Sequence, residues 1–302
     1  IRSQIRKNQM NDILLQWQEN AKTKPARIVL ADLGDPRADE AARYLTKESI
    51  AHIIEPVIDS KNAFAQTAVD NGFDSSDPLI AAALLVKSGA ADAAVAGATR
   101  STAEVLKTGF QILGVSPEVE VVSSSFLMVL PNGINLAYGD CAVLPEPNSE
   151  QLCSIAISTA STYRSLIGEE PRIAMLSFST HGSADHPRVI KVRDAVSLVR
   201  KQDPKLIVDG ELQFDAAWVP EIAASKAPNS SLKGNANVFI FPDLDSANIA
   251  YKITERLAGA RAIGPLLQGL DGIFHDLSRG CSTQDIIDLS VISALQSMTP
   301  KS

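Results

Sequence analysis

The chain has 302 residues, of which 45% are hydrophobic and 21% charged, and its formal net charge is −7. This composition is typical of a soluble globular protein of about two domains, and it excludes a disordered chain, a collagen-like chain and a small disulfide scaffold. The excess of negative charge repels nucleic acid phosphates and anionic membranes, so we expect neither nucleic acid nor a membrane as a partner.

The longest apolar run, at residues 79–86, stops at Lys87 and is too short to span a bilayer. No segment resembles a secretory signal. The three cysteines show no Cys-x-x-Cys spacing, which is typical of a reducing compartment. Together these patterns predict a cytoplasmic protein.

Short apolar runs alternate with helical patterns along most of the chain. Buried parallel strands are predicted at Arg27–Ala31, Ile53–Ile58, Ala91–Ala96, Val119–Val122, Ile173–Phe178, Leu206–Asp209, Asn237–Phe241 and Arg261–Leu266. Between them, helical spacing joins Leu152, Ile155, Thr159, Tyr163 and Leu166; Val189, Val192, Val196 and Val199; and Ile249, Ile253, Leu257 and Ala260. This alternation predicts an α/β fold with mostly parallel sheets.

Two segments depart from the alternation. Between Val119 and Val143, two apolar stretches flank Pro131-Asn132-Gly133, which is typical of an antiparallel hairpin. The last segment, Asp285–Met298, is apolar nearly all round, which predicts a buried helix.

The first candidate site is the turn from Gly97 to Thr102, between a predicted strand and a predicted helix. Such a turn can aim backbone N–H groups at an anion. Ser101 and Glu104 also have the spacing of a capping box, in which two side chains satisfy the first N–H groups of a helix. A plain helix start explains the same residues, and the spacing alone favours it.

The second candidate site is the segment from Asp276 to Asp285. Arg279 can bind an oxyanion through two hydrogen bonds, and Ser278 can donate another. Ser282 and Asp285 have the spacing of a helix N-cap and its N3 carboxylate, so the spacing alone favours a structural role for Asp285.

The third candidate site follows the strand predicted at Asn237–Phe241. Asn248, Lys252 and Arg256 recur every four residues and therefore share one helix face. Two cations on this face suggest an anion, although such residues on helices usually face solvent.

Other chemical signals are weak. No metal is indicated, because the histidines show no ligand spacing, and the Walker, Gly-x-Ser-x-Gly and Gly-x-Gly-x-x-Gly motifs are absent from the sequence. Cys141 is best explained as a small buried hydrophobic residue.

Taken together, these segments resemble the phosphate acetyltransferase (phosphotransacetylase) family, and most closely its ethanolamine-utilisation type. The resemblance extends from about Asp77 to the C-terminus. It rests mainly on the runs RIAMLSFSTHGSA, LIVDGELQFDAAWVPEIAASKAP, GNANVFIFPDLDSANIAYKITERL, AIGPLLQGL and HDLSRGCSTQDI.

The resemblance implies reversible transfer of an acetyl group between acetyl phosphate and coenzyme A, by direct thiolate attack in a ternary complex. Coenzyme A, acetyl phosphate and inorganic phosphate are then the substrates, with no permanently bound cofactor. It also implies a homodimer whose subunits resemble isocitrate and isopropylmalate dehydrogenases, with the active site in the interdomain cleft. We expect one α/β domain at 1–117 plus 267–302 and a second at 118–266.

The resemblance also implies roles for individual residues. Asp285 is the expected general base for the coenzyme A thiol. Ser278, Arg279 and Arg256 are expected to hold acetyl phosphate and stabilise charge on it. The expected substrate-pocket residues are Ser101, Thr102, Lys107, Ser123, Ser124 and Tyr251.

Two departures from the family pattern keep other functions open. Many members have Arg where this chain has Lys107, and many carry an inserted basic segment near Asn71–Asp74. These departures favour a non-catalytic acyl-coenzyme A sensor. The enzyme is favoured by four residues retained together: Ser278, Arg279, Asp285 and Arg256. Transfer of a propionyl or butyryl group is a third possibility. The sequence does not separate ethanolamine utilisation from general acetate metabolism.

Overall fold

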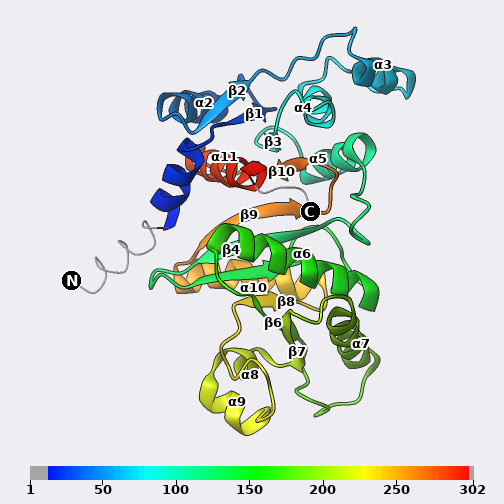
Figure 1. Cartoon of the computed structure of the whole chain (residues 1–302), viewed down its shortest axis with the longest axis vertical. Helices are drawn as coiled ribbons and strands as arrows, with labels where there is room; N and C mark the ends of the chain where they lie inside the picture. The colour runs from blue at the N-terminus through cyan, green and yellow to red at the C-terminus, as the bar shows by residue number, and fades with distance from the viewer. Residues whose placement is uncertain (1–12, 299–302) are drawn as a thin grey trace, which may run out of the picture. The chain divides into compact units, whose positions relative to one another are not determined.

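The computed structural model describes residues 13–298. The chain divides into two compact units, one running to Pro117 and resuming at Ile263, the other comprising Glu118–Ala262. Strands and helices alternate in both units, which confirms the predicted α/β class (Figure 1).

The first unit contains a four-stranded parallel sheet in the order β10-β3-β1-β2. Its strands are β1 (Ala26–Leu30), β2 (Ala51–Ile54), β3 (Ala93–Ala96) and β10 (Ile273–Asp276). Every residue of β3 is buried, as expected for a strand covered on both faces. The carboxyl ends of β1, β3 and β10 lie at one sheet edge, where ligands of parallel α/β sheets usually bind.

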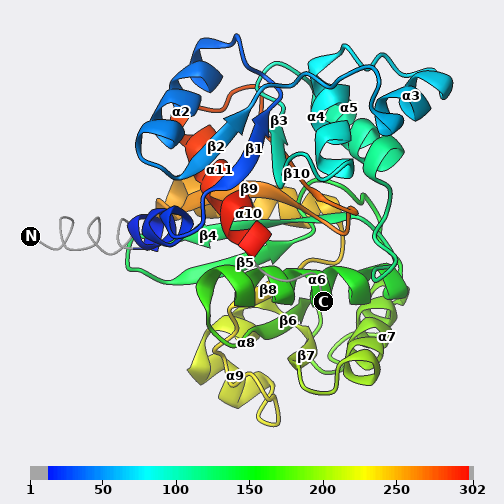
Figure 2. The same ribbon diagram turned by 45° about the horizontal axis from the view of Figure 1, so that its top comes forward.

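Helices cover both faces of this sheet (Figure 2). Residues 13–22 are helical, followed by α2 (Pro36–Lys47), α3 (Ala63–Asp70), α4 (Pro78–Lys87), α5 (Thr102–Thr108), the π-helix η1 (Gly109–Leu113) and α11 (Thr283–Met298). The side chains of Asp35, Asn62 and Asp77 accept backbone N–H groups at the starts of α2, α3 and α4. These caps explain where the three helices begin. Helix α11 packs on α2 and β3 and is mostly buried, as predicted.

A six-stranded sheet has the order β7-β6-β8-β5-β4-β9; its first five strands belong to the second unit, and β9 begins there. The strands are β4 (Ser123–Val129), β5 (Asn135–Gly139), β6 (Arg172–Leu176), β7 (Ile207–Leu212), β8 (Val238–Ile240) and β9 (Arg261–Gln268), along which the chain passes back to the first unit. Strands β4 and β5 pair antiparallel, which confirms the predicted hairpin. Strands β5, β6, β7 and β8 pair in parallel.

The helices of the second unit are α6 (Ser149–Ile167), α7 (Pro187–Gln202), α8 (Phe214–Trp218), α9 (Pro220–Lys226) and α10 (Leu244–Ala258). The apolar stripes predicted on α6 and α7 are buried. The stripe on α10 behaves differently, because Ile249, Ile253 and Leu257 are 57%, 51% and 84% exposed. The spacing therefore predicted which side chains share a face of α10, but it did not predict that this face is exposed.

Two predicted strands differ clearly from the structure, and one observed strand was not predicted. The strand expected at Ile53–Ile58 ends at Ile54, because Pro56 cannot donate a ladder hydrogen bond. Val119–Val122 is not a strand, and pairing begins at Ser123 instead. Strand β10 was not predicted, since it is only four residues long and ends in His275 and Asp276.

Candidate active site

One arginine in the first unit ties together two of the predicted site segments. Nη1 of Arg37, in the first turn of α2, donates to the carbonyl oxygens of Arg279 and Cys281, both at 2.9 Å. Its Nη2 donates to the carbonyl of Ala98, also at 2.9 Å. An ion pair with Asp35, 2.9 Å away, fixes the guanidinium. Arg37 therefore joins the turn after β3 to the segment after β10.

A second group, the buried carboxylate of Asp32, also holds the turn after β3. Asp32, which is 6% exposed, follows β1 and accepts the backbone N–H groups of Ala98 and Thr99, each at 3.0 Å. It also accepts the Thr99 hydroxyl. The turn is thus held in one conformation before α5 begins.

The segment after β10 presents its side chains outward. Ser278 and Arg279 are both exposed. The N–H of Cys281 donates to the Ser278 carbonyl at 2.9 Å, so the backbone forms a tight turn. The Arg279 guanidinium makes no ion pair or hydrogen bond with the residues that the structure describes, and it remains available to an anion.

Asp285 has the structural role that its spacing predicts. Its Oδ2 accepts both the N–H and the hydroxyl of Ser282 at 2.8 Å, and its own N–H donates to Ser282 Oγ at 3.2 Å. This reciprocal pair confirms the predicted cap at the start of α11. Oδ1 of this exposed carboxylate has no partner within residues 13–298, so capping leaves one oxygen able to accept a proton.

The start of α5 also confirms its predicted capping box. Ser101 accepts the Glu104 N–H at 3.3 Å and donates its hydroxyl and N–H to the Glu104 carboxylate. These hydrogen bonds hold the pKa of Glu104 below its usual value. Beside Ser101, the Thr102 hydroxyl donates to Oδ2 of Asp276 at 2.7 Å. Lys107 is exposed in the last turn of the same helix.

In the second unit, two of the expected pocket residues face the interior. Ser123 and Ser124 are 1% and 0% exposed at the start of β4. The Ser124 hydroxyl donates to Asp140, which also accepts the Leu144 N–H at 2.8 Å. Burial raises the pKa of Asp140. The Ser124 hydroxyl is therefore already engaged within its own unit.

Helix α10 carries the third predicted group of residues. Tyr251 is half-buried, and its ring stacks on Phe126 with 4.2 Å between centroids. Nδ2 of Asn248 donates to the Cys141 carbonyl at 3.2 Å, and Lys252 donates to Oδ1 of Asn248. The Arg256 side chain is 79% exposed and pairs with Glu255 at 3.5 Å. Its guanidinium is thus open to solvent.

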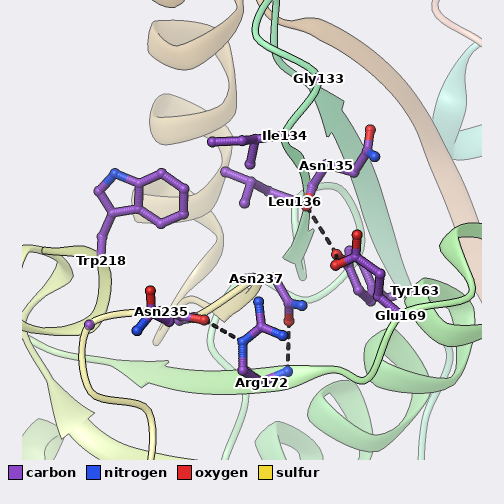
Figure 3. Close-up of a pocket in the computed structure, with 12 residues that line it drawn as sticks. Gly133, Ile134, Asn135, Leu136, Tyr163, Glu169, Arg172, Trp218, Asn235 and Asn237 are labelled. Carbon is purple, nitrogen blue, oxygen red and sulfur yellow. Dashed lines mark hydrogen bonds between the residues drawn. The ribbon is translucent and has the colours of Figure 1, made fainter. Parts of the chain in front are cut away.

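A pocket of about 420 Å³ lies at the amino ends of β5 and β6 in the second unit (Figure 3). Trp218 and Leu136 form an apolar side of the pocket, and Arg172 lies opposite them with Nε bonded to the Asn235 carbonyl. None of the predicted site residues lines this pocket. We therefore assign it no part in the site built from those residues.

Sequence reasoning missed Asp32 and Arg37, and it placed Asp276 in the second candidate segment without giving it a role. Only the Asp32 interaction with the turn after β3 could be anticipated, because both segments end adjacent parallel strands. Cys141 is fully buried, as predicted, and burial raises the pKa of its thiol. Within the described part of the chain, no group of three or more His, Cys, Asp or Glu residues is arranged to hold a metal. No helix there is long and apolar enough to cross a membrane.

Comparison with known proteins identifies the family. Residues 57–294 match the family described as phosphate acetyl/butaryl transferase. The phosphate acetyltransferase of Thermoanaerobacterium thermosaccharolyticum is 41% identical, with 92% of this chain and 97% of the relative aligned.

Two solved structures agree with this match. The EutD phosphotransacetylase from Staphylococcus aureus is 36% identical, with a TM-score of 0.85 over 95% of this chain and 99% of its own. A phosphotransacetylase from Streptococcus pyogenes gives a TM-score of 0.86 at 36% identity, over 95% of this chain and 98% of its own. The EutD neighbour agrees with the expected resemblance to the ethanolamine-utilisation type. The chain belongs to the phosphate acetyltransferase family.

Proposed function

We propose that the protein transfers an acetyl group reversibly between acetyl phosphate and coenzyme A. The observation that carries this proposal is the segment Ser278–Asp285, whose backbone is held by Arg37 while Arg279 and Asp285 remain exposed. It places an unpaired cation and a carboxylate oxygen without a hydrogen-bond partner on one short stretch of chain. The family match over nearly the whole chain supports the same reaction.

The reaction proceeds by direct attack within a ternary complex. Oδ1 of Asp285 takes the proton of the coenzyme A thiol, because an unperturbed thiol such as that of cysteine, with a pKa of about 8.5, is mostly protonated at neutral pH. The thiolate sulfur attacks the acetyl carbonyl carbon, and the new S–C bond forms as the C–O bond to phosphate breaks. Inorganic phosphate leaves with the bonding electron pair. A base held in place is worth about 10²–10⁴-fold in rate.

Cationic and hydroxyl groups stabilise the charge that develops during this step. The guanidinium of Arg279 and the hydroxyl of Ser278 bind the phosphate and the carbonyl oxygen, as does Arg256 on α10. Such donors act most strongly when they need no rearrangement during the reaction. The hydrogen bonds from Arg37 to the backbone of the Arg279 segment provide that preorganisation.

We propose further substrate contacts in each of the two units. Ser101, Thr102 and Lys107 contact substrate from α5, and Tyr251 does so from α10. Ser123 and Ser124 support the pocket from inside the second unit, because their side chains are buried.

An acyl-coenzyme A sensor is the second candidate, and one observation favours it. The Thermoanaerobacterium relative aligns over 319 residues, which exceeds the 302 residues of this chain. The relative therefore contains residues that have no counterpart here. In this structure, a short connection at 71–77 joins α3 directly to α4. A chain that lacks the phosphate contact expected near 71–74 but keeps its other contacts would bind acyl-coenzyme A without turnover.

We further propose a homodimer located in the cytoplasm. The exposed apolar side chains of Ile249, Ile253 and Leu257 on α10 support an interface with a second copy, since such clusters are usually covered. Light scattering tests the oligomer directly, and a monomeric wild-type protein would refute it. Ethanolamine utilisation is the proposed pathway, because of the likeness to EutD.

Turnover with different acyl phosphates tests the function. Purified protein is mixed with coenzyme A and acetyl, propionyl or butyryl phosphate, and thioester formation is measured. Fastest turnover of acetyl phosphate is expected. Preference for a longer acyl group would change the substrate but retain the chemistry. No turnover, with acetyl-coenzyme A binding still seen by calorimetry, would favour the sensor.

A further inference from the structure

A buried carboxyl group in the first unit lies between the two proposed site segments. Asp276 is 1% exposed at the end of β10 and immediately precedes the Ser278–Arg279 segment. Its Oδ2 accepts the Thr102 hydroxyl from the start of α5 at 2.7 Å. Its Oδ1 is buried and has no hydrogen-bond partner within the described residues. A buried, partly unsatisfied carboxyl is costly to the fold, which calls for a functional explanation.

The backbone around Asp276 is shaped to accommodate this side chain. Gly97 has a φ of +115°, and a Cβ built on it would lie 2.6 Å from Oδ1 of Asp276. Any larger residue at this position would therefore collide with the carboxyl group. The Leu277 N–H donates to the Ala96 carbonyl at 2.7 Å, which fixes Asp276 against the end of β3.

We propose that Asp276 is a positioning residue of the acyl-transfer site, which orients the Thr102 hydroxyl and joins the start of α5 to the Ser278–Arg279 segment. The inference rests on the proposed function, because it assumes that Thr102 contacts substrate. Since the Thr102 proton points toward Asp276, its oxygen presents only lone pairs to a bound molecule. Asp276 thereby determines that Thr102 accepts rather than donates a hydrogen bond.

The orientation depends on the charge of Asp276. Burial raises the pKa of Asp276 to about 6, the charge of Asp32 acts in the same direction, and the hydrogen bond from Thr102 opposes both. Below this pH the carboxyl group takes a proton, becomes a weaker acceptor and releases its hold on Thr102. Activity should therefore fall as the pH is lowered through about 6.

Other charged groups around Asp276 are engaged elsewhere. Asp32, which follows β1, accepts the N–H groups of Ala98 and Thr99 in the turn after β3. On and beside α4 and α5, Asp77 pairs with Arg100, and Glu104 with Ser101. Further groups lie on α11 and on β10 itself: Asp285 caps its helix, Asp288 accepts from Gln284, and the His275 ring bonds to Gln296.

The test is a mutant cycle measured across pH. Asp276→Asn, Thr102→Val and the double variant are assayed for kcat/KM with acetyl phosphate between pH 5 and 9, and Thr102→Ser tests rescue by a hydroxyl. Asp276→Asn should lower kcat/KM about tenfold at pH 8, the loss expected when one charged hydrogen-bond acceptor becomes neutral. Asp276→Asn should also remove the inflection near pH 6 from the plot of kcat/KM against pH.

The double variant should be no slower than Thr102→Val alone, because Asp276 acts through Thr102. Thr102→Ser should keep most of the activity. Asp92→Asn serves as the control, since Asp92 precedes β3 at the opposite end of the strand and pairs with Arg27. An unchanged pH profile in Asp276→Asn would overturn the positioning role. So would a double variant whose fold-loss in kcat/KM equals the product of the two single fold-losses. A wild-type protein without thioester synthesis would instead overturn the proposed function.

Discussion

Replacing Asp276 by Asn should stabilise the protein at neutral pH, although it lowers activity. The pKa of Asp276 rises from 3.8 to about 6 on folding, chiefly because burial disfavours its charged form. Each pKa unit corresponds to about 1.4 kcal/mol, so ionisation of the folded protein costs roughly 3 kcal/mol. Asparagine has nearly the same shape and carries no charge, so it avoids this cost.

The sign of the effect follows from proton binding. Between pH 3.8 and about 6, the folded state keeps the Asp276 proton more tightly than the unfolded state does. Stability from this group therefore falls as the pH rises through that window, and it stays low above it. The advantage of Asp276→Asn should be near zero at pH 4 and should reach up to about 3 kcal/mol above pH 7.

Urea unfolding followed by circular dichroism at several pH values between 4 and 8 measures this difference. Asp92→Asn is a matched control of opposite sign, because hydrogen bonds from Arg27 hold the pKa of Asp92 below its usual value. That control should destabilise the protein by an amount that changes little between pH 8 and pH 4, because the pKa of Asp92 is held below 3.8 in the folded protein. An Asp276→Asn variant that is less stable than wild type at pH 7.5, or that shows the same difference at every pH, would refute the reasoning.

Four further substitutions test other parts of the site. Asp285→Asn should lower kcat by about 10²-fold with an unchanged KM for acetyl phosphate, and near wild-type turnover would show that Asp285 only caps α11. Arg256→Ala should raise the KM for acetyl phosphate about tenfold without changing the unfolding midpoint, since the side chain is 79% exposed; unaltered kinetics would exclude its proposed role. Arg37→Lys should lower kcat about tenfold, because one ammonium cannot reach three carbonyls; full activity would mean that the clamp is dispensable. Gly97→Ala should destabilise the fold by about 2 kcal/mol or more, measured by urea unfolding, and wild-type stability would contradict the crowding beside Asp276.

Local sequence patterns predicted the features that depend on neighbouring residues. Both capping boxes, Ser101–Glu104 and Ser282–Asp285, formed as their spacing indicated. The turn at Asn132-Gly133 joined two antiparallel strands for the same reason. In each case the stabilising contacts join residues that are close in the sequence, so the local pattern is enough to predict them.

Features that depend on distant contacts could not be predicted from the pattern. Strand β4 begins with Ser123-Ser124-Ser125, which have little intrinsic preference for a strand, yet all three are buried. The contact of Ser124 with Asp140 helps to hold this start in place. Arg37 reads as an ordinary helix residue, although its guanidinium bonds to Cys281, 244 positions away.

The burial of α10 shows a different limit of sequence patterns. Periodicity placed Ile249, Ile253 and Leu257 on one face, as the structure also does, but that face is exposed. Spacing determines which side chains share a helix face. It does not determine what covers that face, because this depends on the packing of the whole protein.

Thioester synthesis by the purified wild-type protein tests the central claim most directly. Coenzyme A and acetyl phosphate are supplied together, and acetyl-coenzyme A and inorganic phosphate are measured in the same reaction. The proposed mechanism predicts that both products appear in equal amounts and that synthesis runs backward when acetyl-coenzyme A and phosphate are supplied instead. Binding of acetyl-coenzyme A without formation of either product would contradict the proposed enzyme and identify the protein as a sensor.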